Sequence, residues 1–283
     1  RDPEMSRGLG DVYKRQTYGY ILEPDIRTLT KEPEANYSKE IVFGEFHNKT
    51  KNYFSGPKSE LPEESGGWCD YMVELEFFKS MPEGIRKDAW FLTKVTMTGQ
   101  ERNPETGRYP LLNWDDPATN QKHPYWKKNI ESSDWVFNYD DGYYETKGIS
   151  SASGKTRMIF RYADILLLYA EAVAYGTKSI DDLAFDCMWR VQERAGVPLI
   201  SKDVTKEYFQ KAVLDERRWE TAGMEHSCMG RFFTMQRHEI LHLQKNYRDA
   251  AELSLNPNLT LSEEFYYFPI PDNELLIVPG LKD

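Results

Sequence analysis

The stretch Arg161–Tyr175, RYADILLLYAEAVAY, decides the fold of this chain. It is apolar on almost every face and contains neither glycine nor proline, and Gly176 follows it directly. A run of this length and texture predicts a helix, and a glycine just beyond the last apolar residue is typical of a helix end. A helix that is apolar nearly all round belongs in the core of a helical protein.

Three more helices are predicted after this one. The second spans Ile180–Ala195 with Ser179 as its N-cap, the third runs from Thr205 through Glu220, and the fourth covers Gly230–Asn246. Two consecutive helices of similar length joined by a tight turn form a helical hairpin, as in tetratricopeptide arrays. The predicted fold class is therefore mainly α, with tetratricopeptide-like hairpins.

The part from residue 17 to 156 has a different texture, rich in loops and interrupted by glycine and proline. We expect only short elements in this part: strands at Glu40–Phe46 and Phe91–Gly99, a short helix within Tyr71–Phe78, and a turn at Gln100–Tyr109. Near the C-terminus, Phe265–Ile270 is predicted to form an apolar extended run.

The first sixteen residues, RDPEMSRGLGDVYKRQ, are polar, lack periodicity and read as a non-native segment. We predict a loop-rich ligand-binding part over 17–156 and a helical part over 157–283, together forming one continuous domain. On this interpretation the native N-terminal half of the protein is missing from the sequence.

The composition excludes some function classes. The chain carries 36 Lys and Arg against 46 Asp and Glu, a net charge of −10, and has no basic stripe. This argues against nucleic acid as a partner, because phosphate binding needs clustered positive charge. With 40% hydrophobic and 29% charged residues, the chain has enough apolar side chains to form a packed core. Nothing in the sequence is apolar over a membrane-spanning length.

No catalytic or cofactor motif stands out. The sequence lacks a GxSxG elbow, a phosphate-binding GxxxxGK[ST] loop, CxxC spacing and HExxH spacing, so we expect no enzyme activity, no cofactor and no metal site. Arg217, Arg218 and Glu220 are interpreted as structural charges on a helix. Glu171, on an apolar face, is expected to pair with Arg161 or Arg217, since buried charge needs a partner.

Aromatic residues make up 14% of the chain, and those in the polar loops are the best candidates for ligand contact. A sugar ring packs its apolar face on Trp or Tyr, while nearby polar side chains bind its hydroxyls. The stacking candidates are Trp68, Tyr71, Trp114, Trp126, Trp135 and Tyr139. The polar candidates beside them are Asp70, Asn113, Asp115 and Asn138. For each aromatic residue taken singly, packing in the core is the alternative.

The order of several motifs resembles the SusD/RagB family. RYADILLLYAEA is followed by RVQERAGVP, LDERRWETAG, GRFFTMQR and YYFPIPDNEL, and NYSKEIVFGEF lies upstream at residues 36–46. The resemblance covers about residues 36–283. It departs from the family around Glu225–Thr234, where a few residues look inserted and a Thr replaces an Asp, and the tail typical of the family's C-terminus is absent.

The resemblance implies a SusD-like α/α fold and a cell-surface lipoprotein of a Bacteroidetes-type outer membrane, held by an N-terminal lipid anchor that lies outside this sequence. It implies capture of an oligosaccharide and delivery to a TonB-dependent SusC-like transporter, without catalysis. Two alternatives stay open: the same system binding peptides, and a tetratricopeptide-like interaction scaffold without a small ligand. Loop aromatics gathered around one open groove would favour cargo, and their burial would favour the scaffold.

Overall fold

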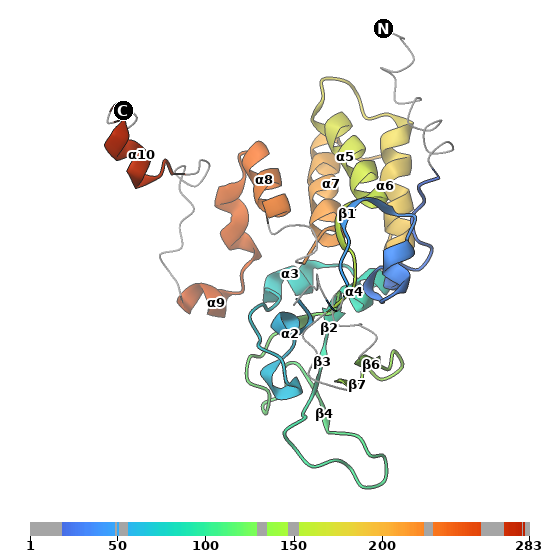
Figure 1. Cartoon of the computed structure of the whole chain (residues 1–283). Coiled ribbons are helices and arrows are strands. Elements are labelled where there is room, and N and C mark those ends of the chain that lie inside the picture. Colours follow the sequence, from blue (N-terminus) through green and yellow to red (C-terminus); the bar gives the residue numbers. More distant parts are fainter. Residues whose placement is uncertain are drawn as a thin grey trace. The chain divides into compact units, whose positions relative to one another are not determined.

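The computed structural model describes residues 19–48, 50, 56–128, 135–146, 153–223, 229–255, 269–278 and 280. The chain forms two compact units, Arg1–Cys228 and Met229–Asp283 (Figure 1). The predicted division at residue 157 falls inside the first unit, where β1 (Ile41–Glu45) pairs with β8 (Arg157–Arg161). One continuous domain over 17–283, with a ligand-binding part over 17–156 and a helical part over 157–283, stays a prediction.

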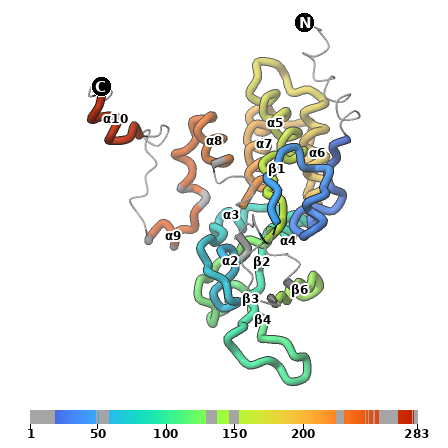
Figure 2. Tube along the Cα trace, viewed as in Figure 1, coloured from blue at the N-terminus to red at the C-terminus, as the bar shows by residue number. Residues whose placement is uncertain are grey.

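Three helices form the α-helical part of the first unit: α5 (Tyr162–Tyr175), α6 (Asp182–Ala195) and α7 (Lys206–Glu220). They lie side by side in Figures 1 and 2, and α5 contacts both of the others. Leu166 and Leu167 of α5 are buried in one core with Val191 of α6 and Phe209 of α7. This position explains why α5 is apolar on almost every face, and the mainly helical, tetratricopeptide-like prediction is confirmed.

The helix caps follow the sequence with one correction. Helix α6 begins at Asp182, and its N-cap is Asp181, whose carboxylate accepts from the Ala184 backbone N–H at 2.8 Å. The prediction of Ser179 was wrong, because Asp181 offers an equally good capping side chain two residues later. Thr205 caps α7 as expected, accepting from the Tyr208 N–H at 3.2 Å.

The loop-rich part of this unit consists of short elements. Its strands pair antiparallel in twos: β1 with β8, β2 (Phe91–Leu92) with β5 (Tyr125–Trp126), β3 (Lys94–Thr96) with β4 (Leu111–Asn113), and β6 (Trp135–Phe137) with β7 (Tyr144–Thr146). The helical turns among them are η2 (Ile26–Thr30), η3 (Glu34–Tyr37), α2 (Gly56–Glu60), η4 (Glu63–Ser65), α3 (Leu75–Ser80) and α4 (Ile85–Trp90).

Most of the short predicted elements are present, with shifted bounds. The strand expected at Glu40–Phe46 is β1, and the one expected at Phe91–Gly99 is divided into β2 and β3. The helix expected within Tyr71–Phe78 begins only at Leu75, because residues 71–73 use their backbone groups elsewhere. The Tyr71 N–H donates to Ser59 O, and the Val73 N–H donates to Pro124 O.

In the second unit the described elements are α8 (Met229–Arg237), η5 (Leu241–Tyr247), α9 (Ala250–Leu255) and α10 (Asp272–Ile277). The single helix predicted over Gly230–Asn246 was wrong. Glu239 adopts a left-handed backbone with φ +56°, and the Ile240 N–H reaches back to Met235 O at 2.8 Å. That pattern ends a helix. Of the predicted run Phe265–Ile270, residues 265–268 lie outside the described residues.

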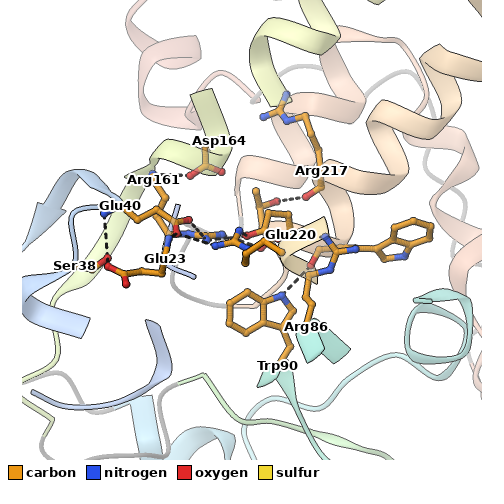
Figure 3. A network of polar contacts seen from close by, with 12 residues as sticks. Glu23, Ser38, Glu40, Arg86, Trp90, Arg161, Asp164, Arg217 and Glu220 are labelled. Atoms are coloured by element: carbon orange, nitrogen blue, oxygen red, sulfur yellow. Dashed lines mark hydrogen bonds and ion pairs between the residues drawn. The ribbon is translucent and has the colours of Figure 1, made fainter. Parts of the chain in front are cut away.

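A buried network of charges joins five segments of the first unit (Figure 3). It consists of three arginines and three glutamates with side chains at most 4% exposed. These are Arg86 on α4, Arg161 at the end of β8, Arg194 on α6, Glu40 just before β1, and Glu216 and Glu220 on α7. Each charge in the network has a partner of opposite sign, so none of these six buried ions is left uncompensated.

Glu220 is the centre of this network. Its carboxylate lies 2.8 Å from Arg161, 2.7 Å from Arg194 and 3.2 Å from Arg86. Glu40 bridges Arg161 and Arg194 from the other side, at 2.9 and 2.8 Å. The interpretation of Glu220 as a structural charge is thereby supported by its contacts.

Glu171 and Arg217 form a separate pair between α5 and α7. Of the two partners that the sequence allowed for Glu171, the structure selects Arg217.

Acid should weaken the fold through Glu220. Burial raises the pKa of this carboxyl, but the charges of Arg194, Arg161 and Arg86 outweigh burial and lower the pKa from 4.5 to about 2. A carboxylate with a lowered folded-state pKa stabilises the protein above its unfolded-state pKa, and this stabilisation is lost as the pH falls through the folded-state value. Between pH 4.5 and 2 we expect Glu220 to account for a loss of about 3 kcal/mol. Urea unfolding at several pH values in this window measures the loss. The expectation is contradicted if the free energy of unfolding falls equally steeply with pH in the wild type and in Glu220→Gln.

Candidate functional site

The first unit contains a cavity of about 510 Å³ in its loop-rich part. It lies among η2, the end of α3, α4, strands β2 and β3, and the turn between β6 and β7. Its lining residues are Arg27, Phe78, Glu83, Ile85, Lys87, Asp88, Phe91, Leu92, Thr93, Lys94, Lys127, Phe137, Tyr139, Asp140, Asp141 and Gly142. A cavity of this size, mixing aromatic and charged groups, suits a small organic ligand.

One wall of the cavity is an aromatic pair with a cation against it. The rings of Phe137 and Tyr139 meet edge to face at 4.9 Å between centroids. The Lys127 ammonium lies 3.9 Å from the Phe137 centroid and 4.5 Å from that of Tyr139. Lys31 and Arg27 also approach the Tyr139 ring, at 4.8 and 5.6 Å. Cations over aromatic faces are attracted by the ring quadrupole, so they contribute to the orientation of the Tyr139 ring, which remains 38% exposed.

The opposite aromatic group comes from α3 and β2. Phe78 and Phe91 meet edge to face at 5.2 Å, and Lys87 lies 4.5 Å from the Phe78 centroid. Trp114, which follows β4, packs its ring against Phe78 at 5.9 Å. The apolar part of the site is therefore continuous with a small aromatic cluster behind it.

The charged lining residues are of both signs. Lys87 pairs with Glu83 at 2.6 Å, Lys127 donates to the Asp88 carbonyl at 3.2 Å, and Asp141 pairs with Arg108 at 2.5 Å. Asp88 and Asp140 have exposed side chains. Lysine and carboxylate groups beside aromatic rings provide donors and acceptors for the hydroxyl or amide groups of a ligand. Because charges of both signs line the cavity, it carries no strong net charge.

The structure brings together some of the predicted site residues at this cavity. Tyr139 lines it, and Asn138 shapes the turn that carries Tyr139, since its side chain accepts from the Asp140 N–H at 2.9 Å. Asn113 accepts from the lining residue Lys94 at 2.5 Å, and Trp114 packs against Phe78.

The other candidates lie elsewhere. Trp68, Asp70 and Tyr71 are exposed in the loop after η4, where Lys58 approaches the Trp68 ring at 5.4 Å. Asp115 is exposed and does not line the cavity. Trp126 packs with Phe91 and Phe77 in the core. The side chain of Trp135 lies outside the described residues. The part that each plays in ligand binding stays a prediction.

Several lining residues were missed from the sequence. Phe137 precedes Tyr139 by two positions, so the alternation of a strand would have placed both rings on one side. Arg27, Phe78 and Lys127 gave no such signal, because they come from segments far apart in the sequence and only the fold brings them together.

Among the described residues, the cysteines and the metal-ligating side chains form no second site of this kind. Cys69 is half-buried, and burial raises the pKa of its thiol to about 11, so it stays protonated near neutral pH. Cys187 is buried, and Cys228 is outside the described residues. Within the described ranges, His, Cys, Asp and Glu side chains form no group of three that could hold a metal ion. Of the described helices, none combines the length and apolar character of a membrane span.

Residues 39–283 match the SusD family, and the chain belongs to it. Solved structures share its fold. A SusD superfamily protein from Parabacteroides distasonis superposes with a TM-score of 0.68 at 18% identity, over 97% of this chain and 55% of that one. One from Bacteroides vulgatus gives 0.63 at 22% identity, over 95% and 56%.

A surface glycan-binding protein A from Bacteroides thetaiotaomicron, solved in complex with laminarihexaose, gives a TM-score of 0.60 at 18% identity, over 97% of this chain and 58% of that one. The chain thus spans a little over half the length of these structures. No curated protein matches it in sequence.

Proposed function

We propose that this chain binds an oligosaccharide in the cavity beside Tyr139 and does no chemistry on it. The observation that carries the proposal is the wall formed by Phe137 and Tyr139, with cationic and carboxylate side chains around the same cavity. A sugar offers an apolar face for the ring and hydroxyls for the polar groups. The family and the fold it shares with a glycan-binding relative support this choice over a protein-interaction scaffold.

Membership of the family supports a wider role. We infer that the captured glycan is handed to a TonB-dependent SusC-like transporter at the outer face of the outer membrane, where a lipid anchor holds the protein. Co-purification of such a transporter with the tagged complete gene product from its native membrane is the expected result. Recovery of the tagged protein without any transporter would count against delivery.

A peptide is the second candidate ligand. The exposed carboxylates of Asp88 and Asp140 at the cavity favour a basic peptide as much as a hydroxyl-rich sugar. Titrations with neutral oligosaccharides and with a lysine-rich peptide, on the same protein preparation, distinguish the two cargoes.

Replacing Tyr139 by alanine should weaken oligosaccharide binding roughly five- to tenfold, because the exposed ring supplies the stacking surface. Calorimetric titration with laminarihexaose and other glucan oligomers measures the effect, using this chain and the complete gene product. Tyr139→Phe should retain most of the affinity. Tyr208→Ala is the matched control, since Tyr208 is an exposed tyrosine on α7 that does not line the cavity.

If the wild type and Tyr139→Ala bind the oligosaccharide equally well, the ligand does not bind in this cavity. Loss of affinity in Tyr208→Ala as large as in Tyr139→Ala would mean that the change is not local to the site.

A further inference from the structure

The turn between β6 and β7 carries Tyr139 of the cavity's aromatic wall, and the hydrogen bonds inside this turn concern its local shape. Within the turn, the Gly142 N–H donates to Asn138 O at 2.9 Å, and the Asn138 N–H donates to Tyr143 O at 2.7 Å. Gly142 has φ +73°, which a side chain would strain. These bonds set the local shape of the turn. They do not tie the turn to neighbouring segments, to which the Tyr139 ring is joined by the cations above it and the turn's backbone by the contacts that follow.

The loop between β3 and β4 is an ordered structure that reaches this turn. The Asn103 side chain accepts from the Glu105 N–H at 2.8 Å, and the Gly107 N–H donates to Asn103 O at 2.8 Å. The Arg102 guanidinium donates to Gly107 O at 2.7 Å. The loop contains the turn predicted at Gln100–Tyr109, and it presents Arg102 and Arg108 from a hydrogen-bonded backbone.

Both arginines bind residues of the turn and of β7. Arg108 pairs with Asp141 at 2.5 Å and lies 4.6 Å from the Tyr143 ring centroid. Arg102 binds both carboxylate oxygens of Glu145, at 3.1 and 3.0 Å. Asp141, Tyr143 and Glu145 alternate along the chain, so they face the loop together. A two-pronged guanidinium–carboxylate contact fixes geometry as well as charge.

Tyr143 connects the two ion pairs. Its hydroxyl donates to Glu145 at 2.6 Å and accepts from the Tyr109 N–H at 3.3 Å, and its ring is buried at 4% exposure. We call Arg102, Arg108, Asp141, Tyr143 and Glu145 the arginine clasp. The Tyr143 N–H and Arg108 lower the pKa of Asp141, and Arg102 and Tyr143 lower that of Glu145, so both carboxylates of the clasp are ionised at neutral pH.

Exposed ion pairs contribute little to stability unless they are bidentate or part of a network, and the clasp is both, so it can hold the loop and the turn in a fixed relative position. The clasp includes Asp141, a cavity-lining residue two positions from Tyr139. It joins a loop that does not line the cavity to the turn that carries its aromatic wall.

We propose that Arg102 and Arg108 are positioning residues of the ligand cavity, holding Tyr139 where a ligand packs on it through the β6–β7 turn. The effect of this positioning on ligand binding rests on the proposed function. The positioning of Tyr139 is itself a property of the free protein, so it can be measured without a ligand.

The first test is hydrogen exchange in the free chain. The substitution Arg108→Gln, alone and with Arg102→Gln, should speed amide exchange over residues 137–145 about fivefold, while exchange in α5–α7 stays unchanged. Arg108→Lys, which keeps the charge, should restore part of the protection. Arg157→Gln is the matched control, because Arg157 is 37% exposed against 41% for Arg108 and faces Glu45 at 3.9 Å on the β1–β8 ribbon.

The second test is titration with laminarihexaose. If the wild type binds and Tyr139→Ala weakens binding, Arg108→Gln should weaken it about fivefold as well, with unchanged thermal stability. Wild-type affinity in Arg108→Gln would overturn the inference and leave the proposed function standing. If the wild type does not bind this glucan, the exchange result decides alone: faster exchange confined to 137–145 supports positioning, and unchanged exchange overturns it.

Discussion

Replacing Glu220 by glutamine is expected to lower the free energy of unfolding by about 3–5 kcal/mol. The side chain is fully buried and contacts Arg86, Arg161 and Arg194. A glutamine keeps the shape and can still accept hydrogen bonds, but it leaves the arginines with less compensating negative charge. Removing one member of a buried ion network is costly because the remaining charges cannot reach water.

Urea unfolding followed by tryptophan fluorescence measures this change. Glu193→Gln is the matched control, since Glu193 has an exposed side chain on the neighbouring helix α6. We expect the control to change the free energy by less than about 0.5 kcal/mol. A Glu220→Gln protein as stable as the control would show that the network is hydrated in solution. A cycle with Arg194→Met would then separate the pairwise contribution.

The second large effect is expected at Gly84, the N-cap of α4. A Cβ built on this residue would lie 2.6 Å from Ala195 O and 2.8 Å from Gly196 O, both backbone atoms at the end of α6. Neither atom belongs to a flexible side chain, so Gly84→Ala must displace α4 from α6. Overpacking together with backbone adjustment should cost about 3 kcal/mol of stability.

The thermal midpoint and the urea midpoint of Gly84→Ala measure this cost. Gly99→Ala is its control, because a Cβ at Gly99 meets no atom within 4 Å. Since α4 also contributes Ile85, Lys87 and Asp88 to the cavity, Gly84→Ala should weaken oligosaccharide binding as well. A stable Gly84→Ala protein would contradict the close approach of the two helices.

Each effect includes a contact between residues more than a hundred positions apart. Glu220 meets Arg86 across α7 and α4, and Gly84 meets Ala195 across α4 and α6. The sequence shows a charged α7 and a Met-Pro-Glu-Gly stop before α4, but neither pattern says that the two meet. Loop-rich segments and helices thus become one cooperative unit through contacts that have no local signature.

The sequence by itself determined helices α5, α6 and α7 and the family. Apolar positions on all sides of Arg161–Tyr175, a threonine cap at Thr205 and glycines after α5 and α6 are local signals, because helix periodicity and capping involve residues within one or two turns. It also determined the tight turn around Asn103–Gly107, where side chain and backbone bind each other within five residues.

Only the tertiary structure decided which loop aromatics share a site. Tyr139 lines the cavity, Trp114 stands behind it, and Trp126 packs in the core, although all three looked alike as aromatic residues in polar loops. The partners that separate them, Arg27, Phe78 and Lys127, come from distant segments. Side-chain exposure depends on what packs against a residue from elsewhere in the chain, and a pattern of neighbouring residues does not contain that information.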